Sequence, residues 1–175
     1  RQQVQRMSDI VRQLLDFGKG TMREKRWSRA AHLAHSAVRT IQKETANRVE
    51  LLASGPEPGP FLYVDPLRLE QALINLLRNA AQSTGTTRVR LSWEITANHE
   101  IVFRVDDDGA GIEDAIKSRI FEPFFSMRNN SANTGLGLAV VHGIIKEHGG
   151  VIQADDADLG GAGFQITLPP QKENG

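Results

Sequence analysis

The sequence contains no cysteine. This absence excludes disulfide bonds, a thiolate nucleophile and a zinc site built on thiolates, and it fits a reducing compartment. No apolar run approaches the length of about 18 residues that a membrane-spanning helix needs, and the charged start RQQVQR is not typical of a secretion signal. We therefore expect a cytoplasmic segment that makes no membrane contact of its own.

The chain also lacks an excess of charge of either sign. Lys+Arg and Asp+Glu both number 21, so no overall field favours nucleic acid or an anionic membrane surface as a partner. Any charged ligand has to be recognised by local groups. The length of 175 residues suffices for one core of ordinary size and a short appendage. We place the appendage at residues 1–20 and the main domain at residues 21–175.

The appendage begins with a helical pattern. Its apolar residues alternate spacings of three and four along one seam, and such a seam needs a partner surface. The seam consists of Val4, Met7, Val11 and Leu14, with Ile10 and Leu15 beside it. Gly18 and Gly20 then predict a turn, and a linker is expected after them.

The main domain mixes helices and strands without a regular alternation. Apolar spacing predicts three helices, at about 28–48, 66–83 and 136–148. Strands are expected at 48–52, 61–64, 89–95, 101–105, and in VIQAD and GFQITLP. The pair Asp65-Pro66 is a helix start signal. This order favours an α+β fold, a two-layer sandwich of a mixed, mostly antiparallel sheet with helices on one face, over a doubly wound fold.

Three stretches lie at element ends, where binding sites concentrate. In NLLRNA, Asn75 and Asn79 share one helix face and can meet one ligand, although solvated asparagines explain this motif as well. VDDDGAGI places three carboxylates and two glycines after a strand, and a solvated acidic turn is the alternative. NTGLGLA, residues 133–139, opens a helix with small residues whose free N–H groups can hold phosphate oxygens.

The order of these stretches is more specific than any of them alone. An Asn-x-x-x-Asn helix, a strand ending in Asp-x-Gly-x-Gly, the segment FEPFF and a helix opened by Gly-Leu-Gly-Leu resemble the ATP-binding domain of sensor histidine kinases, in the GHKL superfamily. The resemblance covers roughly 61–170, and IFEPFF with GLGLAVVHGIIKEHGG is most similar to the nitrogen-regulator-like subgroup. It implies a Bergerat-type fold, ATP and Mg²⁺ as cofactors, and transfer of the γ-phosphoryl group to a histidine.

The resemblance also implies roles for individual residues. Asp107 would accept a hydrogen bond from the exocyclic amine of adenine, while Gly109 and Gly111 let the backbone pass close to base and ribose. Asn79 would give an oxygen ligand to Mg²⁺, with Asn75 near the phosphates. The further expected nucleotide contacts are Gln82, Ile112, Arg128, Thr134, Gly135, Leu136, Gly137 and Leu138.

Some positions depart from the family pattern. Met127 and Arg128 occupy a place where the commoner family pattern has a lysine, and Arg128 can still reach a phosphate. Gln82 stands where many relatives carry a lysine, which weakens one expected phosphate contact. Hydrolytic relatives carry a glutamate at the place of Asn75, and an amide cannot act as a general base, so transfer to an external acceptor is favoured over hydrolysis. A GHKL-fold ATPase, a serine kinase and a non-catalytic nucleotide sensor are the alternatives. Asp106 and Asp108 are interpreted as solvated or capping.

In the family, the phosphoacceptor is a histidine followed directly by an acidic residue and, a few residues later, by a proline. No histidine in this sequence has these neighbours. All five are interpreted as surface or packing residues: His32, His35, His99, His142 and His148. Residues 1–20 resemble the second helix of the dimerisation and phosphotransfer hairpin. The expected partners are the acceptor hairpin and a response-regulator receiver domain. We expect the full-length protein to be a homodimer, and a membrane anchor is compatible with it.

The segment between Glu113 and Thr134 is interpreted as a lid over the nucleotide. Its phenylalanines, Phe121, Phe124 and Phe125, have two interpretations. They form either a small satellite core under a long loop or an apolar latch that docks the lid or touches the phosphotransfer helices.

Overall fold

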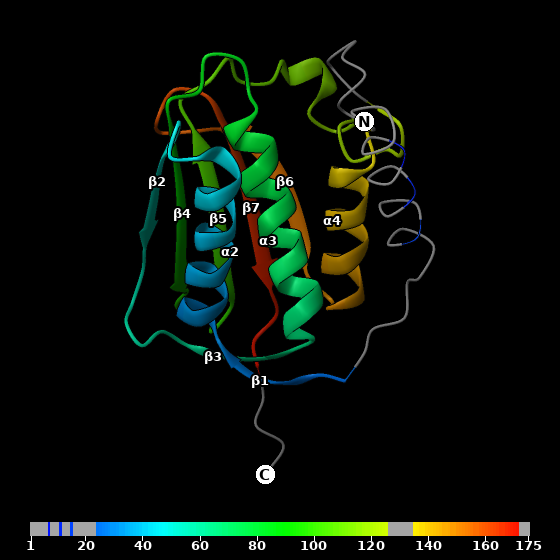
Figure 1. Ribbon diagram of the computed structural model, residues 1–175. Coiled ribbons are helices and arrows are strands. Elements are labelled where there is room, and N and C mark those ends of the chain that lie inside the picture. Colours follow the sequence, from blue (N-terminus) through cyan, green and yellow to red (C-terminus); the bar gives the residue numbers. More distant parts are fainter. Residues whose placement is uncertain (1–6, 8–10, 12–14, 16–23, 126–134, 172–175) are drawn as a thin grey trace.

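The computed structural model describes residues 7, 11, 15, 24–125 and 135–171. The main domain has two layers, a five-stranded sheet and the helices that cover one of its faces (Figure 1). The helices are α2 (Ala30–Thr45), α3 (Pro66–Ala81) and α4 (Gly137–Glu147), with the 3₁₀ turn η1 (Asp114–Ile116). The strands are β1 (Arg26–Arg29), β2 (Glu50–Ser54), β3 (Phe61–Val64), β4 (Arg88–Ile95), β5 (Ile101–Asp107), β6 (Val151–Asp156) and β7 (Ala162–Leu168).

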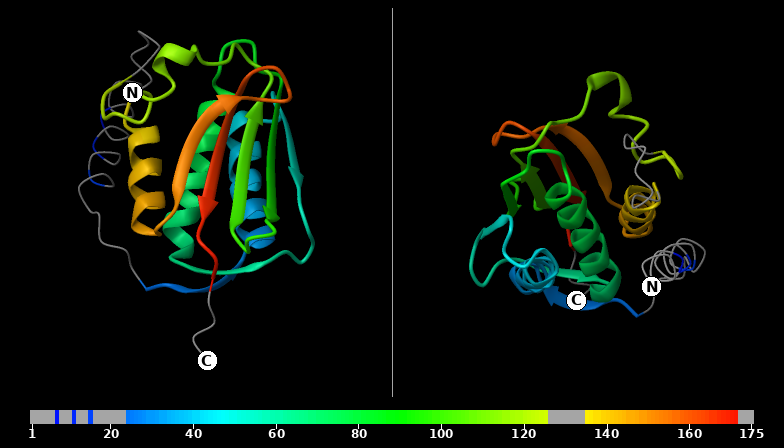
Figure 2. Two further views of the ribbon diagram at one scale, coloured as in Figure 1. Left: turned by 180° about the vertical axis from the view of Figure 1, so that it is seen from behind. Right: turned by 45° about the horizontal axis from the view of Figure 1, so that its top comes forward.

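The main sheet has the strand order β2-β4-β5-β7-β6. Strand β2 runs parallel to β4, and the other three pairs are antiparallel. The view from behind shows the second face of this sheet, over which no helix of the described residues lies (Figure 2). The predicted α+β sandwich with a mixed, mostly antiparallel sheet is therefore confirmed.

The core fills the space between sheet and helices. Helix α3 contributes its predicted apolar face, and Leu69, Leu73 and Leu76 are fully buried against the sheet. Burying one leucine side chain stabilises a fold by about 1.5–3 kcal/mol. Strand β5 lies at the centre of the sheet, where Phe103 is fully buried. The end of β5 is thus held by rigid neighbours on both sides.

The N-terminal end of α3 is fixed by two side chains. Asp65 caps the helix by accepting a hydrogen bond from the Arg68 N–H at 3.2 Å, as its sequence signal predicts. His148 follows α4, and its Nδ1–H donates to the carbonyl of Ile144 at 2.8 Å. Its Nε2 accepts from the Asp65 N–H at 3.1 Å. One neutral imidazole therefore ties the end of α4 to the start of α3, which confirms the packing interpretation for this histidine.

Acidification is expected to weaken this tie. Burial lowers the pKa of His148, while an unfolded histidine has a pKa of about 6.5. The unfolded chain then binds more protons below that pH, so the free energy of unfolding falls as the pH falls. Urea unfolding at about pH 7.5 and about pH 5.5 should show a larger loss for wild type than for His148→Gln.

A matched control for this experiment is His32→Gln, which makes the same change at an exposed position of α2. It should keep the wild-type dependence on pH. Equal losses in the wild type and in His148→Gln would contradict the role given to the imidazole.

Some element boundaries differ from the sequence prediction. The region expected to be a linker and the first residues of a helix at 28 contains strand β1, and α2 begins at Ala30. The strand expected at 48–52 lies at Glu50–Ser54, and β5 continues past residue 105 to include Asp106 and Asp107. Strand β1 pairs with the distant β3, and such non-local pairing leaves no local pattern in RWSR.

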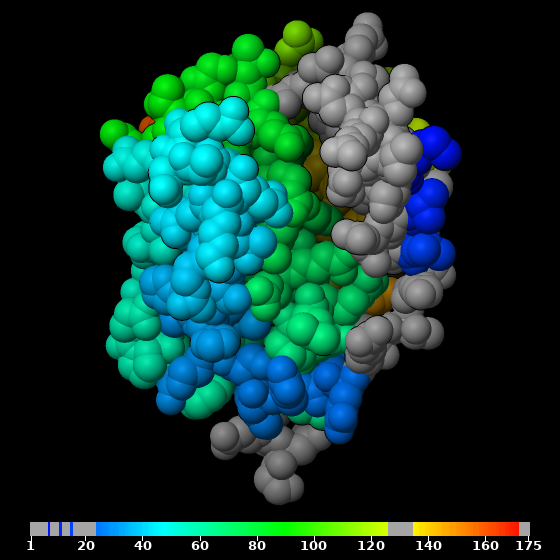
Figure 3. All heavy atoms as spheres, in the orientation of Figure 1, coloured from blue at the N-terminus to red at the C-terminus, as the bar shows by residue number. Residues whose placement is uncertain are grey.

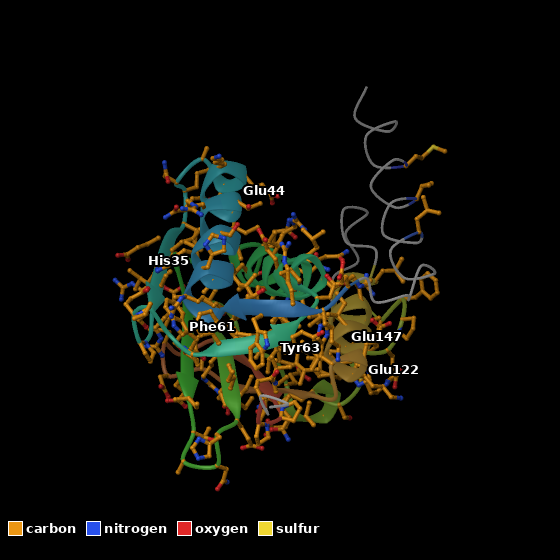
Figure 4. The ribbon with its side chains drawn as sticks, turned by 90° about the horizontal axis from the view of Figure 1, so that it is seen from below. His35, Glu44, Phe61, Tyr63, Glu122 and Glu147 are labelled. Atoms are coloured by element: carbon orange, nitrogen blue, oxygen red, sulfur yellow. The ribbon has the colours of Figure 1, made fainter. Side chains whose placement is uncertain are left out.

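The small sheet of β1 and β3 crosses one end of the molecule (Figure 4). Its outer face carries two cross-strand pairs, Trp27 with Tyr63 and Arg29 with Phe61. The first pair has its ring centroids 5.5 Å apart, and the guanidinium of Arg29 lies 4.0 Å from the Phe61 ring centre. These contacts hold β1 in place at the entry to the main domain.

In the appendage, the described residues Met7, Val11 and Leu15 are helical and expose large parts of their side chains. Val4, Ile10, Leu14, Gly18 and Gly20 lie outside the described residues. Within the part of the chain that the structure describes, no helix is long and apolar enough to span a membrane.

Candidate nucleotide site

Three elements bring the predicted motifs to one end of the sheet, at the top of Figure 1. The last turns of α3, the end of β5 and the first turn of α4 meet there. The connection between α3 and β4 is fastened to the acidic turn after β5, because the Ala110 N–H donates to the carbonyl of Thr84 at 3.1 Å. The sequence prediction that the three motifs share one site is therefore supported by the topology.

Asp107 points from β5 into the helical layer and is 1% exposed. Its Oδ1 accepts hydrogen bonds from the N–H groups of Gly109 at 2.8 Å and Ala162 at 3.2 Å. Its Oδ2 has no hydrogen-bond partner among the described residues. Burial raises the pKa of this carboxyl. A desolvated carboxylate with one unused oxygen can accept a strong hydrogen bond from a ligand amine.

The acid before it has a different environment from the one predicted. Asp106 is 0% exposed, so its interpretation as solvated or capping is wrong. Its Oδ2 lies 2.9 Å from Nη2 of Arg90, and its Oδ1 lies 2.9 Å from Nε of Arg104. The reason is the length of β5, which carries Asp106 inside the sheet on the side opposite Asp107. A buried carboxylate is tolerated there because two guanidinium groups pair with it.

For Asp108 the capping alternative is correct. Its carboxylate accepts from the N–H groups of Thr87 at 2.8 Å and Arg88 at 2.9 Å, and from the Thr87 hydroxyl at 2.6 Å. The hydrogen bond from that hydroxyl is the main cause that lowers the pKa of Asp108 to about 2. Asp108 thus ties the acidic turn to the start of β4.

Glycine is required at two positions of the acidic turn, for a different structural reason at each. A Cβ on Gly109 would lie 2.5 Å from Oγ1 of Thr86 and 2.7 Å from Oγ of Ser83, so glycine lets the connection between α3 and β4 approach the turn. Gly111 has a φ of +75°, which other residues rarely adopt. Contacts of these glycines and of Ile112 with base and ribose stay predictions.

The turn between β6 and β7 also belongs to the site, which the sequence analysis missed. The Gly161 N–H donates to the carbonyl of Asp107 at 3.0 Å, and a Cβ on Gly161 would collide with Oδ1 of Asp107. The sequence signal was the adjacent pair Gly160-Gly161 between the two expected strands VIQAD and GFQITLP.

The two asparagines of α3 have different surroundings. Asn79 is partly buried, and its side chain has no hydrogen-bond partner among the described residues. Asn75 accepts a hydrogen bond at Oδ1 from Nη1 of Arg78, at 3.2 Å. Gln82 is exposed and lines a cavity of about 360 Å³ between the ends of α2 and α3. The expected phosphate contact of Gln82 stays a prediction.

The described start of the lid, from Glu113 to Phe125, is anchored to the sheet. Lys117 pairs with Asp114 of η1 at 2.6 Å and with Asp156 of β6 at 2.8 Å. The Phe121 ring meets Phe164 of β7 edge-on with centroids 6.3 Å apart. The described part of the segment interpreted as a lid is therefore held to the sheet, and its role over the nucleotide stays a prediction.

The three phenylalanines divide between their two interpretations. Phe121 and Phe125 pack against the core, as expected for a satellite core. Phe124 is 69% exposed and has a φ of +64°, a strained backbone for a bulky residue. The latch interpretation stays a prediction for this residue. Arg128 and Thr134 lie outside the described residues.

The glycine-rich helix start follows the lid. Gly135 has a φ of +66°, and a Cβ on it would lie 2.7 Å from the carbonyl carbon of Phe124. Leu136 is buried and Leu138 packs partly against the core, so these residues can offer only backbone groups to a ligand. Helix α4 begins at Gly137 without a side-chain cap. The N–H groups of its first turn lack intrahelical partners, which suits phosphate oxygens.

The sequence of residues 64–172 matches the family described as histidine kinase-, DNA gyrase B-, and HSP90-like ATPase. The chain belongs to this family. Among its relatives, the sensor histidine kinase CpxA of Escherichia coli (strain K12) is 38% identical over 122 residues, which are 67% of this chain and 26% of CpxA. The sensor histidine kinase ZraS of the same strain is 31% identical over 175 residues, 94% of this chain and 35% of ZraS.

This member of the ATPase family thus spans roughly a quarter to a third of the length of these relatives. Among solved structures, the catalytic domain of histidine kinase ThkA superposes with a TM-score of 0.75 at 24% identity. The match covers 85% of this chain and 97% of that domain. This likeness confirms the Bergerat-type fold.

Proposed function

We propose that this chain is the ATP-binding catalytic part of a sensor histidine kinase. It transfers the γ-phosphoryl group of ATP to a histidine on a helical hairpin, for relay to an aspartate of a response-regulator receiver domain. The observation that carries the proposal is the meeting of three groups at one end of the sheet: Oδ2 of Asp107 and the amide of Asn79, which have no partner among the described residues, and the first turn of α4. Base, metal and phosphates each find a suitable group there.

The amide of Asn79 fits Mg²⁺, a hard cation that accepts oxygen ligands. Among the described residues, no group of three or more acidic or histidine side chains could hold a metal ion. A site with one protein ligand suits Mg²⁺, which keeps several waters and binds substrate phosphates. When bound, the ion would neutralise charge on the phosphates, and Asn79 would hold it in place.

Transfer rather than hydrolysis is supported by Asn75. Its amide cannot take a proton from water near neutral pH. The task left to the chain is to position the γ-phosphoryl group and to stabilise its charge, as in other phosphoryl transfers.

Nucleotide selectivity tests this proposal. Calorimetric titration should show binding of ATP and ADP, tighter with Mg²⁺ for ATP. GTP should bind at least about tenfold more weakly, because guanine presents a carbonyl where adenine presents its amine and would leave the Asp107 carboxylate unpaired. Equal affinity for ATP and GTP would refute the base contact.

The appendage is proposed to be the second helix of a dimerisation hairpin in a full-length homodimer, with the catalytic domain in the cytoplasm and any membrane anchor elsewhere in the protein. The exposed side chains of Met7, Val11 and Leu15 support an association surface.

Removal of residues 1–18 is therefore expected to shift a dimer of this chain toward monomer while ATP affinity stays within about twofold, because the site lies beyond Asp65. Sedimentation at equal protein concentrations measures the first effect and calorimetry the second. A monomer both before and after truncation would remove the support for this surface.

A further inference from the structure

Arg78 joins Asn75 to the neighbouring helix α2. Its guanidinium donates from Nε and Nη2 to the two carboxylate oxygens of Glu44, at 2.9 and 2.7 Å. Its remaining nitrogen, Nη1, donates to Oδ1 of Asn75 at 3.2 Å. Glu44 belongs to α2 (Figure 4), and the atoms of α2 lie against those of α3 on the face shown in space-filling form (Figure 3). A chain of three residues thus reaches from α2 to the predicted phosphate contact.

This chain fixes which end of the Asn75 amide faces Arg78. A guanidinium only donates hydrogen bonds, so the amide has to present its oxygen to it. The planar amide then directs its NH₂ group away from Arg78. Among the described residues this NH₂ group has no partner. The two-pronged contact with Glu44 holds the plane of the guanidinium and therefore the position of Nη1.

We infer that Arg78, held by Glu44, is a positioning residue that turns Asn75 into a hydrogen-bond donor toward the nucleotide phosphates. The inference rests on the proposed nucleotide site. Phosphate oxygens are negatively charged acceptors, so an amide NH₂ group stabilises them and an amide oxygen repels them. Without Arg78 the amide can rotate, and part of its population presents the unfavourable end.

A purely structural ion pair predicts different results. The side chains of Arg78 and Glu44 are 36% and 42% exposed, and exposed pairs contribute little to stability. Arg78→Met should therefore keep the wild-type midpoint of urea unfolding. Its ATP affinity should fall about tenfold, the cost of disturbing a hydrogen bond to a charged group. Its affinity for adenosine, which has no phosphates, should not change.

The sign of the Glu44→Gln effect separates positioning from simple charge. This variant removes a negative charge near the site, so long-range electrostatics alone predicts tighter ATP binding. Positioning predicts weaker binding, because the amide of the new glutamine cannot hold both guanidinium nitrogens. Arg88→Met is the matched control, since Arg88 pairs with Glu50 at 2.8 Å on strands β4 and β2. It removes the same charge and should bind ATP and adenosine as wild type does.

The test is completed by calorimetric titration of these variants with ATP and adenosine. Two more variants are included: Asn75→Ala, and the double variant that combines Asn75→Ala with Arg78→Met. Asn75→Ala should weaken ATP binding by a similar factor, and Arg78→Met should add nothing in that background. Additive losses, equal losses for ATP and adenosine, or unweakened ATP binding by Glu44→Gln would overturn the inference. If the wild-type chain binds neither ligand, the nucleotide site itself is refuted, and the inference with it.

Discussion

Asn79→Ala should remove the effect of Mg²⁺ on ATP binding and reduce phosphotransfer to a supplied histidine hairpin by at least about 100-fold. The amide of Asn79 is the proposed protein ligand of the metal, and its side chain has no other partner among the described residues. Its loss should therefore leave the fold intact. Titration of ATP with and without Mg²⁺ and radiolabel transfer measure the two effects.

Asn75→Glu serves as the contrasting change on the same helix face. It places a carboxylate where hydrolytic relatives carry their base, but it also adds a negative charge near the phosphates. We expect weaker ATP binding, less phosphotransfer and at most a modest gain in hydrolysis. If Asn79→Ala keeps the wild-type response to Mg²⁺, the metal assignment is wrong.

Asp107→Asn is expected to weaken ATP and ADP by about 10- to 150-fold, because a charge-assisted hydrogen bond contributes about 1.5–3 kcal/mol. The structural basis for this loss is the buried Oδ2 of Asp107, to which no described residue donates a hydrogen bond. Glu94→Gln, the corresponding change from carboxylate to amide at an exposed position of β4 far from Asp107, should bind both nucleotides as wild type does. Asp106→Asn is unsuitable as a control, because it would leave two guanidinium groups without their buried partner.

Asp107 also makes opposite contributions to stability and to binding. Burial raises the pKa of Asp107 above its value in the unfolded chain. At a pH above this raised pKa, the ionised carboxylate therefore lowers the free energy of unfolding of the nucleotide-free protein. Protonation of the carboxylate removes this destabilisation as the pH falls. Asp107→Asn should therefore unfold at the same or a higher urea concentration than wild type, near neutral pH, while it binds ATP poorly. A large loss of stability would show that the carboxylate is structural.

Local signals made part of the fold predictable. Asp65-Pro66 and the leucine spacing of α3 act within one helix, and alternation identified β4 and β5 with only small errors at their ends. Strand β1 was missed because its partner β3 lies about one helix and one strand away in sequence. Propensity within four residues carries no information about such a partner.

In the site, too, local features could be predicted from the sequence and non-local contacts could not. The motif order indicated Asp107, Asn79 and the start of α4, because each motif keeps its chemistry within a few residues. The burial of Asp106 depends on Arg90 and Arg104, one of them on another strand. Gly161 lies far from Asp107 in sequence, in the turn between β6 and β7, yet its N–H donates to the carbonyl of Asp107. These contacts arise from the sheet order, which a single sequence does not specify.

The central claim is phosphoryl transfer to histidine, and one measurement tests it most directly. The chain is incubated with Mg²⁺ and ATP labelled at the γ-phosphate, first alone and then with a separately supplied acceptor hairpin that contains the histidine. The account predicts slow release of phosphate by the chain alone and rapid labelling of the hairpin, with a phosphate bond that acid breaks and base does not. An unlabelled hairpin, together with ATP hydrolysis at about one turnover per second or faster by the chain alone and unchanged in Asn79→Ala, would contradict it.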